Sequence, residues 1–289
     1  MRAAALLTGL SLLAAVAPGG AAEPSVNPAL DPITVHARRE RATVERKVRH
    51  FVSVIGLAPL ESKLTRWREK DPICPLVGGL PRDHGEFILH RLSQVAAAAG
   101  APLGPEHCTP NFDVVVTADP AALLKAWGGR EGALFGDAAD SRIQSFLDLS
   151  SPIRVWYNVG LVDEDGRPVA ISYQSGIGID ENTMSRFKWR EAPALESVIV
   201  IVDSRLTRGI SFGQLADYVS MIGLVKIRFD ANLDDAPSIL QLFSAPPGAR
   251  PAGLSAWDQS FLKALYHVDP MDRMQLSEIK IAVLRDVAP

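Results

Sequence analysis

Two histidines at a fixed spacing are the first residues in this chain that raise the question of metal chemistry. His84 and His90 bound the segment HGEFILH, six positions apart. A zinc-binding helix instead places its histidines one turn apart, as in H-E-x-x-H, so that both face one metal ion. A spacing of six puts the side chains on different faces of a helix. We therefore interpret both as surface or helix-capping residues.

An acidic segment, FDANLDD, has oxygen-bearing side chains at the spacing of a calcium loop. Asp230, Asn232 and Asp234 would occupy the first, third and fifth positions of such a loop. The sixth position is Asp235 where glycine is needed, and the twelfth is Gln241 where a bidentate glutamate is needed. These departures exclude a standard EF-hand, and a looser Ca²⁺ contact stays as an alternative.

Nucleophilic and acid–base patterns are also incomplete. Ser175 precedes a glycine in YQSGIG, but the hydrolase pattern G-x-S-x-G needs another glycine two positions earlier. The sequence has no phosphate-binding glycine loop of the Walker or dinucleotide type. Asp217, together with Glu196 or Asp203, supplies carboxylates for a metal-independent hydrolase. That activity is the alternative to the binding role argued below.

The chain has two cysteines, Cys74 and Cys108, and its N-terminus predicts the compartment in which they lie. Met1 and Arg2 precede an apolar run, and the small residues of PGGAA follow it. This pattern is typical of a secretory signal at residues 1–22, cleaved after Ala22. In a periplasmic or secreted protein the two cysteines are expected to pair, closing a loop worth roughly 3–4 kcal/mol. Two free thiols are the alternative.

The remaining composition favours a globular exported protein. Hydrophobic residues make up 47% of the chain, and the formal net charge of −3 argues against nucleic acid as a general partner. The apolar run of the signal is shorter than the roughly 20 residues of a membrane-spanning helix, and we expect no membrane span. Residues 36–50 are rich in arginine, which predicts either a solvated helix start or a basic contact with anionic lipid or an envelope partner.

The order of expected elements indicates an α+β fold with a single twisted mixed sheet and packed helices. We expect a flexible basic lead-in over residues 23–47 and one domain over 48–289. Strands are predicted around 73–77, at NFDVVV and at SVIVIVD, and a hairpin is predicted at IRVWYNVGLVDEDGRPVA. Helices are predicted between them, and a final helix at LSAWDQSFLKALY.

The segment SFGQLADYVSMIGL, residues 211–224, predicts a helix with clear ends. Ser211 and Gln214 form the sequence pattern of a capping box. An apolar stripe follows on one face, and Gly223 stands where a left-handed C-terminal stop is expected. These features alone are those of an ordinary core helix.

The same helix resembles the zinc-binding helix of metzincin-type zincin-like metallopeptidases, which carry H-E-x-x-H-x-x-G-x-x-H. Gly223 and Leu224 match the glycine and the residue after it. Further matches extend the resemblance over residues 67–266. APSIL resembles the Met-turn with Leu240 at the methionine, and GLSAWDQSFLKALY resembles the closing helix. The resemblance implies a zincin-like fold.

The residues at the ligand positions depart from the family. Ala216 and Ser220 stand at the first two histidines, Lys226 at the third, and Asp217 at the catalytic glutamate. Alanine has no donor atom and lysine is a cation, so no zinc and no other cofactor is expected. The resemblance then implies a non-catalytic pseudo-metallopeptidase with a binding or scaffold role in the cell envelope, its partner an envelope protein or peptide.

The five positions Ala216, Asp217, Ser220, Gly223 and Lys226 are called the relic site below. If the resemblance extends to geometry, Ala216, Ser220 and Lys226 cluster, and Lys226 forms an ion pair with Asp217 where the metal would be. In the alternative, Lys226 points to solvent and Asp217 lies on an exposed helix face.

Overall fold

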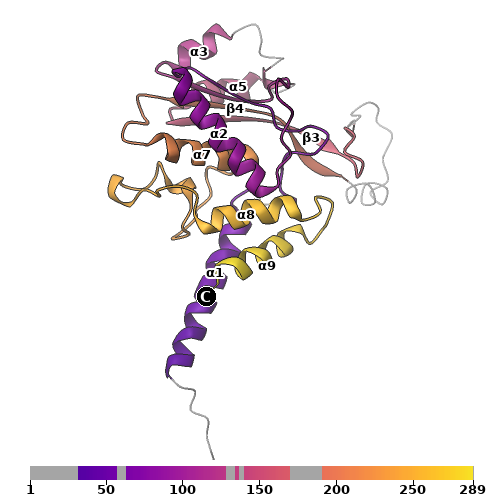
Figure 1. The fold of residues 1–289 in the computed structure, drawn as a ribbon, viewed down its shortest axis with the longest axis vertical. Helices are drawn as coiled ribbons and strands as arrows, with labels where there is room; N and C mark the ends of the chain where they lie inside the picture. Colours follow the sequence, from indigo (N-terminus) through magenta and orange to yellow (C-terminus); the bar gives the residue numbers. More distant parts are fainter. Residues whose placement is uncertain (1–31, 57–62, 128–133, 137–139, 170–190, 289) are drawn as a thin grey trace, which may run out of the picture. The chain divides into compact units, whose positions relative to one another are not determined.

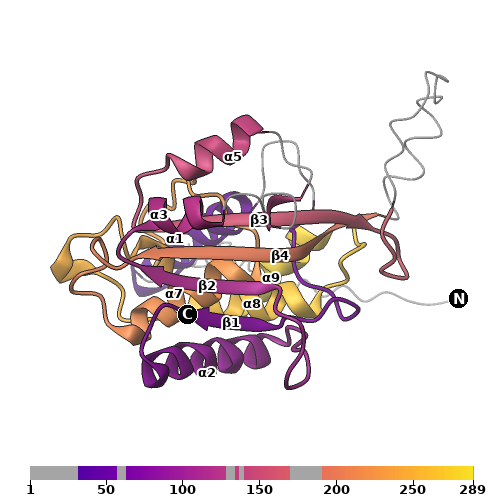
Figure 2. The same cartoon turned by 90° about the horizontal axis from the view of Figure 1, so that it is seen from above.

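Runs of β-branched residues build a four-stranded sheet at the centre of the computed structural model. Its strands lie in the order β1-β2-β4-β3, which Figure 2 shows from above. β1, β2 and β4 are parallel, and β3 pairs with β4 in the antiparallel sense. The strand bounds are Pro75–Gly78 for β1, Phe112–Thr117 for β2, Ile153–Val162 for β3 and Ala192–Asp203 for β4. The α+β class with one mixed sheet is therefore confirmed.

The structure describes residues 32–56, 63–127, 134–136, 140–169 and 191–288. The predicted signal at 1–22, its cleavage point, the start of the lead-in and Ser175 all lie outside these ranges. Residues from Arg39 onward form one compact unit, and the residues before it form another. No helix in the described ranges is both long enough and apolar enough to cross a membrane.

Helices cover both faces of the sheet (Figure 1). A larger core lies between the sheet and the helices α1, α2, α7, α8 and α9, and a smaller core lies under α3 and α5. The helix bounds are Pro32–Val54 for α1, Arg82–Ala99 for α2, Pro120–Ala126 for α3, Asp140–Leu147 for α5, Phe212–Leu224 for α7, Ala256–His267 for α8 and Gln275–Val287 for α9. Two 3₁₀ turns are η1, Ile239–Gln241, and η2, Pro247–Ala249.

β4 explains why the sequence SVIVIVD is apolar at consecutive positions. Val198, Val200 and Val202 point into the larger core, whereas Ile199 and Ile201 point into the smaller one. A strand covered on both faces needs apolar residues throughout. The strand therefore sets the positions of both helical layers, and α7 follows directly after it.

The two cysteines form the expected disulfide. Cys74 and Cys108 are bonded, with their Cα atoms 5.9 Å apart. The side-chain amide of Asn111 reinforces this link, because its oxygen accepts the Cys74 N–H at 2.8 Å and its nitrogen donates to the Pro72 carbonyl at 3.1 Å. The disulfide thus joins the start of β1 to the approach to β2.

The structure has more helix near both ends of the chain than the sequence predicted, in α1 at the N-terminal end and in α9 at the C-terminal end. α1 runs from Pro32 through the expected boundary between residues 47 and 48, so the described part of the predicted lead-in is helical. Its last turns contribute Val48, Phe51 and Ile55 to the larger core. α9 was missed, and α8 is not the final helix as predicted. Of the predicted hairpin, β3 and the turn after it are present. The return arm pairs with the end of β3 through an antiparallel bridge between Val162 and Pro168, and the Val169 N–H donates to the Leu161 carbonyl at 2.8 Å; Ala170 lies outside the described ranges.

Candidate functional site

The helix that carries the resemblance is held at its start by the predicted capping box. The Ser211 hydroxyl accepts the Gln214 N–H at 3.1 Å, and the Gln214 side chain accepts the Ser211 N–H at 3.0 Å. From Leu215 to Leu224 every residue of α7 is buried. α7 packs against α2, the sheet and η1, so its surroundings are core on every side.

Gly223 has a different role from the predicted left-handed stop, and that prediction was wrong. α7 continues to Leu224, and the helix ends at Val225 in extended conformation, with φ −146°. A Cβ at Gly223 would overlap the ring of Phe112 in β2. The Gly223 carbonyl also accepts the indole N–H of Trp67 at 2.7 Å. Glycine is therefore needed here for close packing of helix on sheet.

The relic positions do not offer a metal site. Ala216 and Ser220 are fully buried in the larger core. The Ser220 hydroxyl donates to the Ala216 carbonyl at 2.7 Å, so its bond stays within the helix. Lys226 lies after the helix end, where its backbone N–H donates to the Thr65 carbonyl at 3.1 Å. These residues do not fit zinc, which needs about three protein ligands. The described ranges also hold no cluster of three metal-binding side chains.

Asp217 is a relic residue whose side chain is held by strong polar contacts from outside its helix. Its carboxylate accepts Arg91 Nε at 2.6 Å and Arg91 Nη2 at 3.3 Å, and it also accepts the Leu254 N–H at 2.9 Å. The hydrogen bond to Asp217 raises the pKa of Arg91 above its ordinary value. Asp217 is buried, so the expectation that it lies on an exposed helix face is wrong. The expected ion pair with Lys226 is also wrong, because the carboxylate pairs with Arg91 of α2.

Gly253 allows this close approach, because a Cβ there would press on the Asp217 carboxylate at 2.6 Å. The chain can therefore pass directly over Asp217 on its way to α8. Asp217 thus ties three elements together: α7, α2 and the segment that begins α8. The ion pair is a bidentate, charge-assisted contact of the stronger kind.

A second buried carboxylate joins the other two segments of the resemblance. Asp258 in α8 is fully buried and accepts the Ser238 hydroxyl at 2.6 Å and the Ile239 N–H at 2.8 Å. It also accepts the hydroxyl and N–H of Ser255, both at 2.9 Å, which completes the capping box of α8. Burial raises the pKa of Asp258, and these four donors act in the opposite direction. APSIL is thereby fixed to the closing helix.

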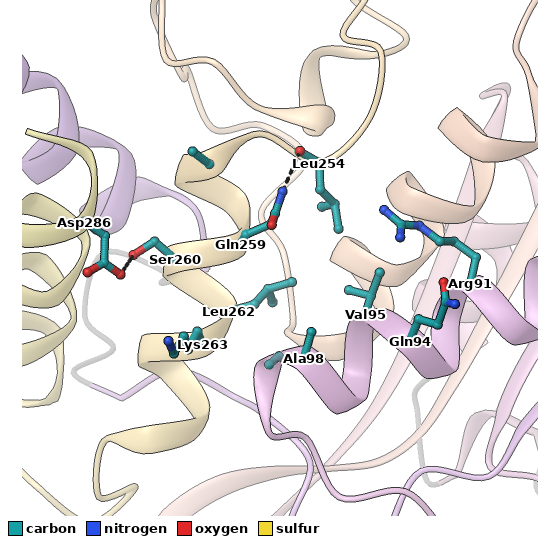
Figure 3. A pocket seen from close by; sticks show the side chains of 12 residues that line it. Arg91, Gln94, Val95, Ala98, Leu254, Gln259, Ser260, Leu262, Lys263 and Asp286 are labelled. Carbon is teal, nitrogen blue, oxygen red and sulfur yellow. Dashed lines mark hydrogen bonds between the residues drawn. The ribbon is translucent and has the colours of Figure 1, made fainter.

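A cavity of about 330 Å³ lies beside the Asp217–Arg91 pair, between α2 and α8 (Figure 3). Arg91 and Leu254, which both bond to Asp217, form part of its wall. The lining is largely apolar along Val95, Ala98, Ala99, Leu254, Ala256 and Leu262, with a polar rim of Arg91, Gln94, Gln259, Ser260, Lys263 and Asp286. Two rim side chains are fixed: Gln259 donates to the Leu254 carbonyl at 3.1 Å, and Ser260 donates to Asp286 at 2.7 Å. We call this cavity the α2/α8 pocket.

The carboxylates of the alternative hydrolase do not converge with Asp217. Asp203, at the end of β4, follows Ile199 and Ile201 in the alternation that points to the smaller core. α7 and Asp217 lie on the opposite face. Arg205 holds the pKa of Asp203 below its usual value through a bond of 2.8 Å. Glu196 is exposed on β4, about 23 Å along the strand from Asp203 at 3.3 Å per residue.

The other sequence candidates serve the packing of neighbouring elements. His84 stacks on Phe212 at 4.2 Å between ring centroids, and His90 bonds to Gln94 at 2.9 Å. In the acidic loop, the three carboxylates face cations or histidine, and two of these partners are on α1. The pairs are Asp230 with Arg228 at 2.7 Å, Asp234 with His50 at 3.3 Å and Asp235 with Lys47 at 3.4 Å. The acidic loop therefore docks on basic residues, in an arrangement unlike the oxygen cage of a Ca²⁺ site.

Sequence reasoning missed the importance of Arg91, which lies 126 positions from Asp217.

Comparison with known proteins adds no assignment: no protein-family model, no curated protein and no solved structure matches this chain.

Proposed function

We propose that this protein is an exported, non-catalytic pseudo-metallopeptidase with a zincin-like fold, and that it binds an envelope protein or peptide. The observation that carries the proposal is the closure of α7, by which we mean that its relic positions are buried in the core or bonded within the protein and are not open to a ligand or substrate. Ala216 and Ser220 are buried in the core, and the carboxylate at the glutamate position is held by Arg91 and Leu254. A catalytic carboxylate must instead reach a water beside the reacting bond.

The zincin-like part of the proposal draws support from the contacts among its three segments. α7 packs against η1 and α8, and Asp258 of α8 bonds to Ser238 and Ile239 of APSIL. Segments that resemble one family in sequence order are thus also neighbours in space. The disulfide and the sequence of residues 1–22 support export to the periplasm or beyond.

The α2/α8 pocket is the surface we assign to binding. Its volume of about 330 Å³ is within the range of ligand-binding cavities. An apolar floor with amide and charged groups at the rim suits an apolar side chain whose flanking peptide groups need hydrogen-bond partners. A short peptide segment with one large apolar residue is the ligand that this lining fits best.

Two adjacent alanines of α2 allow a matched test. Ala98 lines the pocket, whereas Ala97 is exposed and is not part of the lining. Peptides selected from a displayed random heptapeptide library on the mature protein should bind the Ala97→Phe variant as they bind wild type. The Ala98→Phe variant should bind them at least about tenfold more weakly, because the phenyl ring occupies the floor. Equal binding by the two variants would contradict the assignment of the pocket.

A further inference from the structure

A second cavity has a volume of about 370 Å³ and two arginines in its wall. It contains no residue of α7 and shares no lining residue with the α2/α8 pocket. Its inner wall comes from the segment 66–70, where Arg66, Trp67 and Arg68 lie, and from Tyr266 at the end of α8. Asp163 and Asp165, in the turn after β3, and Asp269 also line it. We call it the Arg68 cavity.

Arg66 is a structural member of this wall. It is 6% exposed, and its two terminal nitrogens donate to the carbonyls of Leu265 and Val268 at the end of α8. Its guanidinium carbon lies 5.4 Å from the centroid of the Tyr266 ring. The charge of Arg66 is thus used to bind the carbonyl end of a helix, where a cation is favoured. Arg66 therefore does not offer its terminal nitrogens to a ligand.

Arg68 is held far less well by the protein. Within the described ranges, the one hydrogen bond of its side chain is from Nη2 to the Pro193 carbonyl, at 3.5 Å, and its Nε is buried without a partner. Burial, followed by the nearby charge of Arg66, lowers the pKa of Arg68 to about 10. A guanidinium has five N–H donors that match the two oxygens of a carboxylate. The residue is half-buried, and the nearby charge of Asp269 acts against the effect of burial on its pKa. The N–H groups of Arg68 that have no hydrogen-bond partner are available to a carboxylate from outside.

The exposed part of the lining, which we call the mouth, is mainly acidic, and Lys70 is the one exposed cation among the lining residues. Asp163 and Asp165 lie in the turn, Asp165 paired with Arg167 at 2.5 Å, and the exposed Asp269 carboxylate caps the Met271 N–H at 2.8 Å. Acids outnumber bases in the lining, by five (Glu69, Asp163, Glu164, Asp165 and Asp269) to three (Arg66, Arg68 and Lys70). A polyvalent anion would be repelled at this mouth, whereas a ligand with a positive charge behind its carboxylate would be attracted.

We propose that the Arg68 cavity binds a small zwitterion, with a carboxylate on the Arg68 guanidinium and an ammonium group facing the acidic mouth. Amino acids and the C-terminal ends of short basic peptides have this chemistry. This cavity is not the proposed peptide site, so the tests of the two proposals are independent of each other.

Calorimetric titration of the mature protein with four simple probes tests the proposal. 6-Aminohexanoate has both charges, hexanoate lacks the cation, 1,5-diaminopentane lacks the carboxylate, and inorganic phosphate is the polyvalent anion. We expect saturable binding of 6-aminohexanoate, and binding of the other three that is at least about tenfold weaker, as the loss of one charge-assisted contact predicts. Equal or tighter binding of any of the three would overturn the proposal.

Two variants locate the site. Arg68→Met keeps the length of the side chain but removes its charge, and it should weaken 6-aminohexanoate binding by about tenfold or more. Without ligand, the same variant should melt no lower than wild type, because it removes a half-buried charge with few hydrogen bonds. Arg82→Met, an exposed arginine of α2 paired with Glu86, should bind as wild type does. Unchanged affinity in folded Arg68→Met protein would overturn the assignment.

Discussion

Replacing Arg91 is the perturbation that tests the closure of α7 most sharply. The side chain of Asp217 is 7% exposed, whereas that of Arg91 is 39% exposed. In Arg91→Met, the buried carboxylate keeps the Leu254 N–H as its only described donor. Removing one partner of a buried ion pair costs roughly 3–5 kcal/mol. Water can enter beside the partly exposed position, so we expect a loss near the lower end, about 3 kcal/mol.

Asp217→Asn should cost less, about 1–2 kcal/mol. Its side-chain oxygen still accepts from Leu254, and the remaining arginine can turn toward water. The double variant should be more stable than the sum of the two losses predicts, since no buried charge is left without its partner. Urea unfolding followed by tryptophan fluorescence gives these free energies. Arg82→Met is the control on the same helix and should show only a small change.

This reasoning fails if Arg91→Met destabilises the protein no more than Arg82→Met does. It also fails if Asp217→Asn is the more damaging of the two single changes, because the burial of the carboxylate then does not set the cost.

The other predictions concern packing, the disulfide and pH. In urea unfolding, Gly223→Ala should destabilise the protein by about 1–3 kcal/mol or more, because the new methyl group overlaps the ring of Phe112. Gly213→Ala, in the first turn of α7, is the matched control: the atom nearest to its new Cβ is 3.8 Å away, so the change should be neutral or stabilising by up to about 1 kcal/mol. Reducing the disulfide should cost about 2–4 kcal/mol in the same assay, and an unchanged midpoint would argue that the bond constrains little. Because Arg205 lowers the pKa of Asp203 from 3.8, their pairing contributes stability above about pH 4 that is lost as pH falls through the lowered pKa. The difference in stability between Arg205→Met and wild type should therefore be full at pH 6 and should shrink as the pH falls below about 4; a constant difference would refute this.

Local signals in the sequence predicted the features that depend on near neighbours. The capping box of Ser211 and Gln214 follows from backbone preferences within a few residues. The pairing of Cys74 with Cys108 follows from the compartment and from the number of cysteines. In each case the chemistry needed for the prediction lies within the segment or is unique in the chain.

Features that depend on distant packing were not predictable in the same way. Arg91 and Asp217 meet because α2 lies against α7, and nothing near Asp217 in sequence favours Arg91 over Lys226. Gly223 resembles a helix stop locally, but the ring of Phe112 from β2 determines its role. The burial of Ala216 and Ser220 likewise depends on which elements cover α7. The resemblance directed attention to α7 but said nothing of the elements that surround it.

Zinc titration of the purified protein tests the central claim most directly. After dialysis against a chelator, the protein should take up far less than one zinc per chain at micromolar metal, because Ala216, Ser220 and Lys226 stand at the positions that the resemblance aligns with three histidines. The same preparation should not cleave a denatured protein substrate with or without zinc. Stoichiometric zinc uptake, with proteolysis that depends on it and is lost in Asp217→Asn, would contradict the account.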